Sequence, residues 1–243
     1  MPSPKLQIVA NGRSDSLALP PRAAQPAAFE RPGRDFYRRA GKRAMDLAIS
    51  FAGLALLSPV LLAVAVLVKC ASPGTVLYWQ ERVGCGGRIF RIAKFRSMVA
   101  HADRQGPAIT ALGDPRVTRL GAMLRKLKID ELPQLWNVLR GEMSLVGPRP
   151  ELPVYVTGYT EEQRRVLAVR PGITDVASIR YRDEEKILAA SACAEEFYRR
   201  VVLPHKLELN AEYIQQMSFS FDVRLIFQTL KLLVVSPPSR QPN

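Results

Sequence analysis

The sequence predicts an α+β fold that is mainly α-helical, with a small β-hairpin, a membrane helix at the front and amphipathic helices at the membrane interface. An uncharged apolar run occupies residues 47–68, a length that suits a membrane helix. Two β-rich runs flank a glycine-rich turn at 84–87. In much of the rest of the 243-residue chain, apolar residues recur at helical spacing. We therefore expect one folded domain attached to a membrane.

The two ends of the chain are polar and lack apolar periodicity. Residues 1–40 are rich in Pro, Ala, Ser and Arg, so we expect a disordered tail there. No apolar core follows the first methionine, which argues against a secretory signal peptide. We expect the membrane segment at 41–72, the folded domain at 73–236 and a second disordered tail at 237–243.

The charges that flank the apolar run bear on its path through the membrane. Basic residues stand on both sides of it: Arg34, Arg38, Arg39, Lys42 and Arg43 come before it, and Lys69, Arg82, Arg88, Arg91, Lys94 and Arg96 come after it. Short basic flanks favour the cytoplasmic side of a membrane. Both ends of the run therefore favour the same side, which a straight span cannot satisfy.

A proline lies near the centre of the apolar run. Pro59 has no backbone N–H, and its ring clashes with the carbonyl four residues earlier, that of Ala55. The hydroxyl of Ser58 can donate to a backbone carbonyl and add to the bend. A helix broken at Ser58 and Pro59 would enter the membrane, turn and leave on the same face as a re-entrant hairpin. A simple kinked transmembrane helix is the alternative, since many such helices contain proline.

The folded domain begins with a predicted hairpin and continues with helices. We expect strands at 75–83 and 88–95. Helices are expected at 118–128, 129–140, 160–169, 184–203, 207–217 and 222–235. Pro133 suits the first turn of the second helix and Gly141 its end. Asp222 is placed to cap the last helix.

Composition narrows the function without deciding it. The net charge of +13 implies an anionic partner, which is nucleic acid, acidic lipid or a phosphorylated substrate. Three scattered cysteines (Cys70, Cys85 and Cys193) form no CxxC pair, which argues against a zinc site or a disulfide scaffold. The two histidines, His101 and His205, offer little to a triad mechanism.

Adjacent carboxylates supply the first candidate site. Asp130 and Glu131 stand at the start of a predicted helix, close to the cations Arg125, Lys126 and Lys128. Such a helix start attracts phosphate, and the same field favours an ionised Asp130. An ionised carboxylate can attack phosphorus and form an acyl phosphate, while its neighbour holds Mg²⁺. The alternative is that both acids only stabilise the helix start.

Two basic patches strengthen the case for a phosphate site. Lys94 and Arg96 end the second predicted strand, where side chains can point into a site. Arg149 lies between two prolines that stiffen its backbone, which lowers the entropy lost in holding a guanidinium on phosphate. Alone, each patch is equally consistent with a basic surface or an ordinary loop.

Together these motifs resemble a known family. KFRSM at 94–98, DPRVTRLGAMLRKLKIDELPQLWNVLRGEMSLVGPRPE at 114–151 and RPGIT at 170–174 follow one another, preceded by KRAMD at 42–46 and QERVG at 80–84. In this order they strongly resemble the bacterial sugar transferases of the monotopic phosphoglycosyl transferase family, over about residues 42–234. Such an ordered set is highly specific, although no single motif is decisive.

The resemblance implies a reaction and a set of site residues. The residue matching Asp130 attacks the β-phosphate of a UDP-sugar and releases UMP; polyprenyl phosphate then takes the sugar phosphate. The residue matching Glu131 supports Mg²⁺. The serine and proline matching Ser58 and Pro59 break the membrane helix, so that it leaves the membrane on the side from which it entered. Candidate substrate- or phosphate-binding residues are Lys94, Arg96, Arg125, Arg149, Glu151 and Arg170. The domain would face the cytoplasm at the bacterial inner membrane, where basic residues hold it against anionic lipid.

The sequence departs from the family pattern at two places. Lys128 and Ile129 replace a small polar residue and a leucine before the acidic pair, and Asp175 follows RPGIT where glycine is common. Two other functions stay open: a glycosyltransferase that releases UDP, and a basic membrane-tethered binding module. An aromatic content of 7% gives no marked stacking platform, so we expect no nucleic acid partner. We expect residues 181–209 to select the sugar, and the sequence indicates no oligomeric state.

Overall fold

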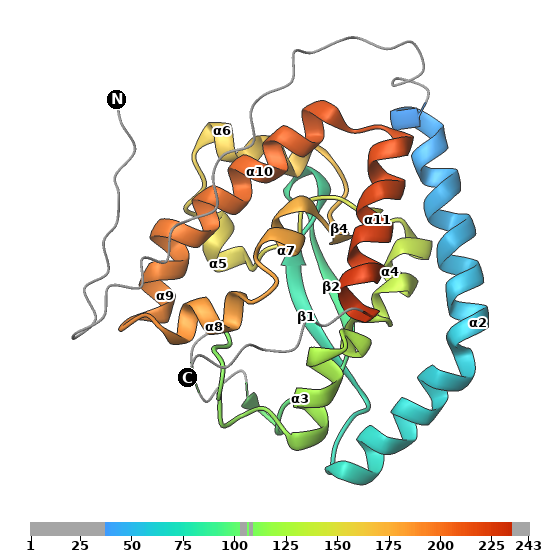
Figure 1. The fold of residues 1–243 in the computed structure, drawn as a ribbon, viewed down its shortest axis with the longest axis vertical. Coiled ribbons are helices and arrows are strands. Elements are labelled where there is room, and N and C mark those ends of the chain that lie inside the picture. The colour runs from blue at the N-terminus through green and yellow to red at the C-terminus, as the bar shows by residue number, and fades with distance from the viewer. Residues whose placement is uncertain (1–36, 103–105, 107–108, 235–243) are drawn as a thin grey trace.

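The computed structural model of this protein describes residues 37–102, 106 and 109–234. This part of the chain is mainly helical and contains two small two-stranded sheets, which confirms the predicted fold class in outline (Figure 1). The predicted tails lie outside the described residues, except that Tyr37–Gly41 forms a π-helical turn. The proposed boundaries between tail, membrane segment and domain stay predictions.

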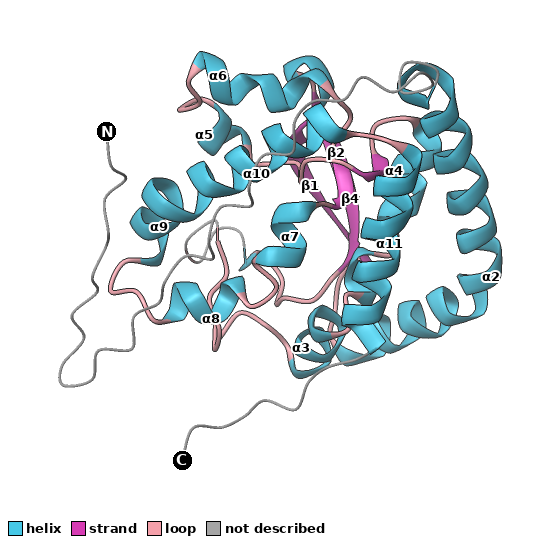
Figure 2. Cartoon of the chain, turned by 45° about the horizontal axis from the view of Figure 1, so that its top comes forward, coloured by secondary structure: helices cyan, strands magenta, loops and turns pink. Residues whose placement is uncertain are grey.

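The apolar segment forms one long helix, α2 (Lys42–Ala71), with Pro59 inside it. Its axis turns partway along its length in two views (Figures 1 and 2). Because Pro59 has no N–H, the Ala55 carbonyl lacks its usual helical donor. The hydroxyl of Ser58 donates to that carbonyl instead, at 2.8 Å. The predicted serine–carbonyl bond in the helix is therefore confirmed.

The first turns of α2 are fixed to the folded domain by buried polar contacts. The carboxylate of Asp46 accepts hydrogen bonds from the Ser144 hydroxyl at 3.1 Å and from the Leu145 amide at 3.0 Å. Lys42 forms an ion pair with Asp222, which is fully buried. Because buried charges are stable only when they are paired, these contacts fix the start of α2 against distant parts of the chain.

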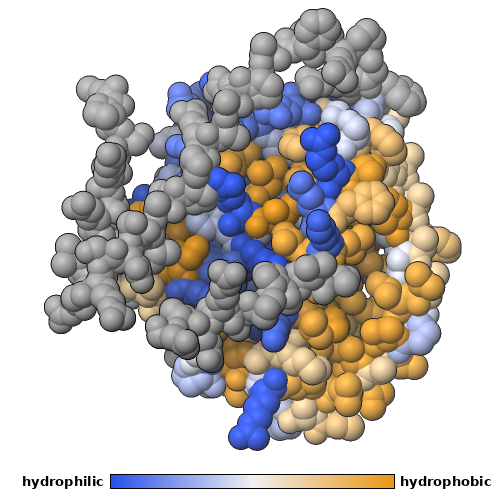
Figure 3. All heavy atoms as spheres, in the orientation of Figure 1, coloured by the Kyte–Doolittle hydropathy of each residue, from blue (hydrophilic) through white to orange (hydrophobic). Residues whose placement is uncertain are grey.

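The second half of α2 packs on the same domain. Val64 and Val68 are buried in one hydrophobic cluster with Phe95 and Leu124. Most other large apolar side chains of the helix are exposed: Leu47, Ile49, Phe51, Leu56, Val60, Leu62, Val66 and Leu67. Hydrophobic residues gather on the side of the molecule where α2 lies (Figure 3). In the described part of the chain, α2 alone is long and apolar enough to cross a membrane, judged by length and composition.

The predicted hairpin is present. Strands β1 (Leu77–Val83) and β2 (Ile89–Phe95) pair antiparallel, from Leu77 opposite Phe95 to Val83 opposite Ile89. Gly86 and Gly87 take positive φ values of 67° and 77° in the turn between them, which glycine adopts without strain. Alternate residues of a strand share a face, so Gln80 and Arg82 lie on the same face as Lys94.

Of the two helices predicted after the hairpin, the structure confirms the first and contradicts the second. Helix α3 (Arg119–Lys126) agrees with the prediction, and Thr118 caps it by accepting from the Gly121 amide at 2.9 Å. The continuous helix predicted at 129–140 is wrong. Residues Ile129–Glu131 form a 3₁₀ turn, and α4 (Gln134–Arg140) begins only after it, ending at Gly141 with φ of 81°.

The rest of the described chain contains a second sheet that the sequence did not reveal. Strands β3 (Ser144–Val146) and β4 (Gly172–Thr174) pair in parallel. The other helices are α5 (Pro153–Val156), α6 (Glu161–Arg164), α7 (Val176–Arg180), α8 (Glu184–Ala189), α9 (Ala194–Phe197), α10 (Leu203–Gln216) and α11 (Phe219–Val234). In Figure 2, α7 and α11 lie next to the strands, whereas α8 and α9 lie farther to the left.

Two further predictions need correction. The helix expected at 184–203 is split, because α8 and α9 are separated by a bend, and a π-helical turn at Tyr198–Val202 leads into α10. Asp222 is not the cap of the last helix, since α11 begins at Phe219. Its buried carboxylate instead accepts hydrogen bonds from the hydroxyls of Tyr37 at 2.6 Å and Tyr213 at 2.7 Å.

Candidate active site

The acidic pair lies in the 3₁₀ turn between α3 and α4. Asp130 and Glu131 are both buried, with 6% and 8% of their surface exposed. The preceding residue, Lys128, has a left-handed backbone with φ of 57°. A lysine in this region is strained, because its Cβ crowds the backbone. The strained residue turns the chain sharply between the end of α3 and the acidic pair.

Two of the predicted cations contact Glu131. Both terminal nitrogens of the Arg149 guanidinium donate to its carboxylate, one of them at 3.2 Å. Lys94 donates to the same carboxylate at 3.2 Å. The structure therefore brings Glu131, Lys94 and Arg149 together beside Asp130, although 55 residues separate Lys94 from Arg149 in sequence. A planar guanidinium that makes two parallel bonds also fixes the direction of the carboxylate.

The two acids differ in their electrostatics. Burial alone would raise the pKa of Glu131, but the charges of Arg149 and Lys94 outweigh it and hold that pKa well below its ordinary value. Burial, followed by the charge of Glu131, raises the pKa of Asp130 above its ordinary value, and nearby cations such as Lys94 only oppose this shift. The expectation that the nearby cations favour an ionised Asp130 is therefore wrong in direction, and the cations dominate at Glu131 instead.

Lys94 is itself perturbed by its surroundings. Burial lowers its pKa from 10.5 to about 8, against the opposing charge of Glu131. Its amino group thus loses its charge within the range of ordinary assay conditions. A lysine that titrates there is a strong candidate for a functional site, because such shifts concentrate where charges are brought together for chemistry.

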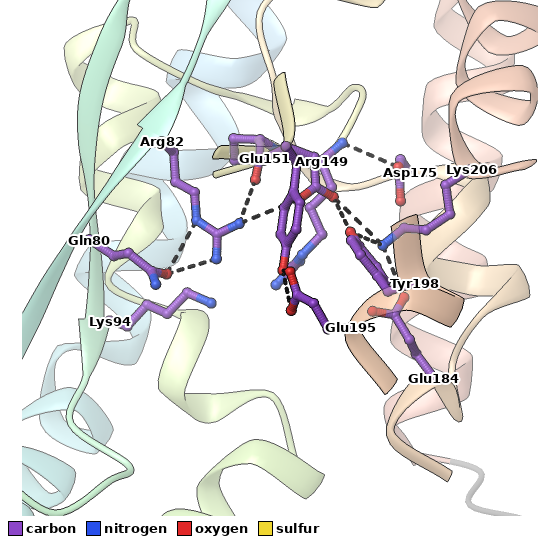
Figure 4. A network of polar contacts seen from close by, with 12 residues as sticks. Gln80, Arg82, Lys94, Arg149, Glu151, Asp175, Glu184, Glu195, Tyr198 and Lys206 are labelled. Atoms are coloured by element: carbon purple, nitrogen blue, oxygen red, sulfur yellow. Dashed lines mark hydrogen bonds and ion pairs between the residues drawn. The ribbon is translucent and has the colours of Figure 1, made fainter. Parts of the chain in front are cut away.

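Beside the acidic pair lies a polar network that sequence reasoning largely missed (Figure 4). Arg82 donates to the Gln80 amide oxygen at 2.7 Å and to the Pro150 carbonyl at 3.0 Å. Gln80 and Arg82 are two residues apart on β1. Lys94 lies on the paired strand β2, and its side chain is on the same face of the hairpin. That spacing was the available signal, since alternate strand residues point the same way. The hairpin therefore contributes three polar side chains to one face.

The network continues from the loop that carries Arg149, residues 148–151, to the helices on its other side. Glu151 accepts a hydrogen bond from the Tyr198 hydroxyl at 2.6 Å, and Lys206 lies 3.8 Å from the same carboxylate. Lys206 also donates to Glu184 at 2.9 Å. Asp175 accepts from the backbone amide of Arg149 at 3.2 Å. No sequence signal marked Tyr198 or Lys206, because their burial depends on helices that pack together from distant segments.

Three predicted phosphate binders have other partners in this structure. Arg125 forms an ion pair with Glu185 at 2.5 Å. Arg96 donates to the carbonyl of Ser72 at 2.7 Å, where it satisfies a carbonyl just after the end of α2. Arg170 donates to the carbonyl of Gly141, at the end of α4 away from the acidic pair. Each of these cations lies near the C-terminal end of a helix, where it also stabilises the partial negative charge of that end.

The acidic pair fits a magnesium ion. Oδ1 of Asp130 is buried without a hydrogen-bond partner among the described residues, which leaves an oxygen available as a ligand. In the same part of the chain, no three His, Cys, Asp or Glu side chains cluster as a complete metal site. Mg²⁺ does not need one, because it keeps several waters and binds through one or two carboxylates plus substrate phosphates. Asp130 offers a free oxygen for this, and Glu131 would bind the ion in place of part of its contacts with Arg149 and Lys94.

Comparisons with known proteins agree with these observations. A family model described as "Bacterial sugar transferase" matches residues 37–236. A protein of Aeromonas hydrophila named UDP-N-acetylgalactosamine-undecaprenyl-phosphate N-acetylgalactosaminephosphotransferase is 41% identical over 198 residues, which are 79% of this chain and 43% of the relative. An undecaprenyl-phosphate glucose phosphotransferase of Komagataeibacter xylinus is 43% identical over 202 residues, 80% of this chain and 36% of the relative.

A third relative is nearer in length. The UDP-glucose:undecaprenyl-phosphate glucose-1-phosphate transferase of Caulobacter vibrioides is 37% identical over 198 residues, which cover 80% of this chain and 70% of that protein. The chain spans less than half of each of the first two relatives. The match to the family model covers the long apolar helix, the hairpin, the acidic pair and the loop with Arg149. The chain therefore belongs to the bacterial sugar transferase family.

Proposed function

We propose that this protein is a phosphoglycosyl transferase that moves a sugar-1-phosphate from a UDP-sugar to polyprenyl phosphate, such as undecaprenyl phosphate. It would thereby begin the assembly of an exopolysaccharide or another glycoconjugate. The observation that carries the proposal is the buried acidic pair, in which Glu131 is held by two cations while Oδ1 of Asp130 has no partner among the described residues. The family and the names of the relatives support the substrate class.

The reaction proceeds in two displacements at phosphorus. A carboxylate oxygen of Asp130 attacks the phosphorus that carries the sugar; the bond to UMP breaks, and UMP leaves with the bonding electrons. The sugar phosphate is then esterified to Asp130. A phosphate oxygen of the polyprenyl phosphate attacks the same phosphorus and restores the free carboxylate. Two such steps divide one difficult transfer between a soluble and a lipid substrate.

The surrounding residues stabilise charge during both steps. Lys94 and Arg149 are placed beside the pair, where they can donate hydrogen bonds to phosphate oxygens as well as to Glu131. Preorganised cations of this kind act most strongly where water is excluded. Glu131, with Asp130, would hold Mg²⁺, which neutralises the charge of the diphosphate when it is bound.

The membrane arrangement rests on the contacts of α2. Lys42 and Asp46 fix its start to the domain, and Val64 and Val68 pack its second half on the same domain. One folded domain lies on one side of a membrane, so these contacts support a re-entrant helix, bent at Pro59, over a span. We propose that the domain faces the cytoplasm at the inner membrane, where basic residues meet anionic lipid.

The released nucleotide tests the reaction. The full-length protein is incubated in detergent with Mg²⁺, undecaprenyl phosphate and each of a panel of UDP-sugars, and the nucleotide is identified by chromatography. We expect UMP in amounts equal to the lipid-linked product. Release of UDP would instead identify a glycosyltransferase, and no transfer from any UDP-sugar would refute the proposal.

Labelling of introduced cysteines tests the membrane arrangement. The three native cysteines are replaced by serine, and single cysteines are introduced at Ala40 and Ala71, which flank the apolar stretch and are exposed. In inverted membrane vesicles, a membrane-impermeant maleimide should label both positions. Labelling of only one position without permeabilising the vesicles would identify a true span.

A further inference from the structure

The loop that carries Arg149 is held by backbone contacts on both sides. The Arg149 amide donates to Asp175 at 3.2 Å, and the Pro150 carbonyl accepts from Arg82 at 3.0 Å. The Glu151 carbonyl accepts from the Val83 amide at 2.9 Å. The direction of the Arg149 guanidinium therefore depends on how firmly residues 148–151 are held.

The side chain of Glu151 provides a further hold on the same loop. Only 8% of Glu151 is exposed, and its carboxylate accepts from the Tyr198 hydroxyl at 2.6 Å. The Nζ of Lys206 lies 3.8 Å from it, and Arg82 lies 3.9 Å from its other oxygen. In Figure 4 this carboxylate stands between the hairpin residues and those of the helices. A carboxylate buried this deeply stays in place only while cations and donors surround it.

Lys206 is the residue on which this arrangement depends from the helical side. It is 5% exposed, and it bridges Glu151 on the loop and Glu184 on α8, which lies 2.9 Å away. Along the network, positive Arg82, negative Glu151, positive Lys206 and negative Glu184 alternate. Without Lys206, the carboxylates of buried Glu151 and partly exposed Glu184 would lose the cation that lies between them, and their repulsion would displace the loop.

We propose that Lys206 is a positioning residue of the transfer reaction, acting through Glu151 on the loop that directs Arg149 at the acidic pair. It does not touch the reacting phosphate itself. The kinetic part of this proposal rests on the function proposed above, whereas its structural part does not. The competing view is that the network only stabilises the fold.

Hydrogen–deuterium exchange tests the structural part without any substrate. In the full-length protein, Lys206→Met should speed exchange at least fivefold in peptides covering residues 144–156 and leave peptides from α2 unchanged. Lys186→Met is the matched control. The Lys186 side chain is 57% exposed, and its ion pair among the described residues is with nearby Asp183. Unchanged exchange in the loop, or equal acceleration throughout the protein, would overturn the proposal.

A second variant keeps the test decisive if Lys206→Met misfolds. Tyr198→Phe removes one hydroxyl that donates to Glu151 and keeps the ring, so it should accelerate exchange in the same loop by a smaller factor. If Lys206→Met does not fold, this variant decides the matter. A loop that exchanges at the normal rate in Tyr198→Phe would then contradict the proposed hold.

A double-mutant cycle tests the kinetic part. Lys206→Met should lower kcat at least tenfold in the wild-type background but less than twofold in an Arg149→Lys background, because the loop then has no guanidinium to direct. Lys206→Arg should recover most of the loss. Losses that multiply would show that Lys206 acts independently of Arg149. If the wild type transfers nothing, the proposed function fails, while the exchange measurement still decides the hold on the loop.

Discussion

At the scale of single residues, the two acids of the pair differ in their surroundings. Glu131 is paired with Arg149 and Lys94, whereas Asp130 has a raised pKa and an oxygen, Oδ1, without a hydrogen-bond partner among the described residues. A nucleophile with fewer stabilising partners is less impeded in attacking phosphorus, provided that it is deprotonated. In the proposed reaction, the cations that hold Glu131 would also be available to the transferred phosphate.

The charge of Lys94 should set the basic limb of the pH–rate profile. Its pKa of about 8 predicts that activity falls above pH 8, as the amino group loses its charge. Lys94→Arg should move this limb to higher pH, because a guanidinium stays protonated. Transfer rates measured from pH 6 to 10 at saturating substrate check this. An unshifted basic limb in the variant would assign the limb to another group.

Whereas activity should fall above pH 8, the contribution of Lys94 to the free energy of unfolding should rise with pH. Between pH 8 and 10.5 it is mostly neutral in the folded protein and mostly protonated in the unfolded chain. The unfolded state then binds more protons, so the contribution of Lys94 to stability rises with pH over this window. The difference in unfolding free energy between wild type and Lys94→Met should therefore shift in favour of the wild type from pH 8 to 10, measured by denaturant titration. A shift toward the variant would contradict the lowered pKa.

The four residues that the structure brings together at the candidate site were singled out in the sequence because they carry local signals. Asp130 and Glu131 are adjacent, Lys94 ends a recognisable strand, and Arg149 lies between prolines. Lys206 carries no such signal, because a lysine in an amphipathic helix usually faces solvent. Its burial follows from how α8, α9 and α10 pack around Glu151, and single-chain periodicity contains no information on that packing.

At the scale of elements, local structure was predicted better than paired structure. The hairpin was found because a glycine turn marks it in sequence, and α3 because apolar residues recur there at helical spacing. Strands β3 and β4 have three residues each and pair across a long connection, so they show no periodicity. The break before α4 was missed because left-handed backbone at Lys128 is unusual for lysine.

Replacing Lys128 with glycine should relieve strain in the turn before the acidic pair. Because glycine adopts positive φ freely, Lys128→Gly should stabilise the protein by about 1 kcal/mol. Lys126→Gly is the control, since Lys126 ends α3 in right-handed geometry and its replacement should destabilise by up to about 1 kcal/mol. Thermal unfolding in detergent compares them. Equal losses in both variants would refute strain at Lys128.

The bend in α2 should depend on two residues. The double replacement Ser58→Ala and Pro59→Ala restores the N–H that the Ala55 carbonyl lacks and removes the serine bond. We expect the straightened helix to pull away from the domain at one end. The cysteine labelling described above should then give different accessibility at Ala40 and Ala71. Equal labelling of both positions in this variant would show that the bend does not determine the membrane path.

At the scale of the whole molecule, α2 is integrated with the domain through contacts between the two ends of the described chain. Lys42 and Asp222 are 180 residues apart and form a buried ion pair. Tyr37 and Tyr213 donate to the same carboxylate. The long apolar helix is thus part of the fold rather than an added anchor, and in the proposed reaction this would hold the site close to a lipid substrate.

Breaking this pair should destabilise the whole protein. Asp222→Asn leaves the charge of Lys42 buried without compensation, which should cost about 3–5 kcal/mol. The midpoint of thermal unfolding in detergent should fall by roughly 10 °C. Asp183→Asn is the control, since Asp183 is 61% exposed, and it should change stability by less than about 0.5 kcal/mol. Similar midpoints for the two variants would contradict a stabilising role for the pair.

The most direct test of the account is the mass of the protein during turnover. The full-length enzyme is mixed with its UDP-sugar and Mg²⁺ in the absence of lipid acceptor, quenched and analysed by intact and peptide mass spectrometry. We predict an added sugar phosphate on Asp130 that disappears when undecaprenyl phosphate is supplied, and no adduct in Asp130→Asn. Full transfer activity in Asp130→Asn, or turnover without any adduct on Asp130, would contradict covalent catalysis by this residue.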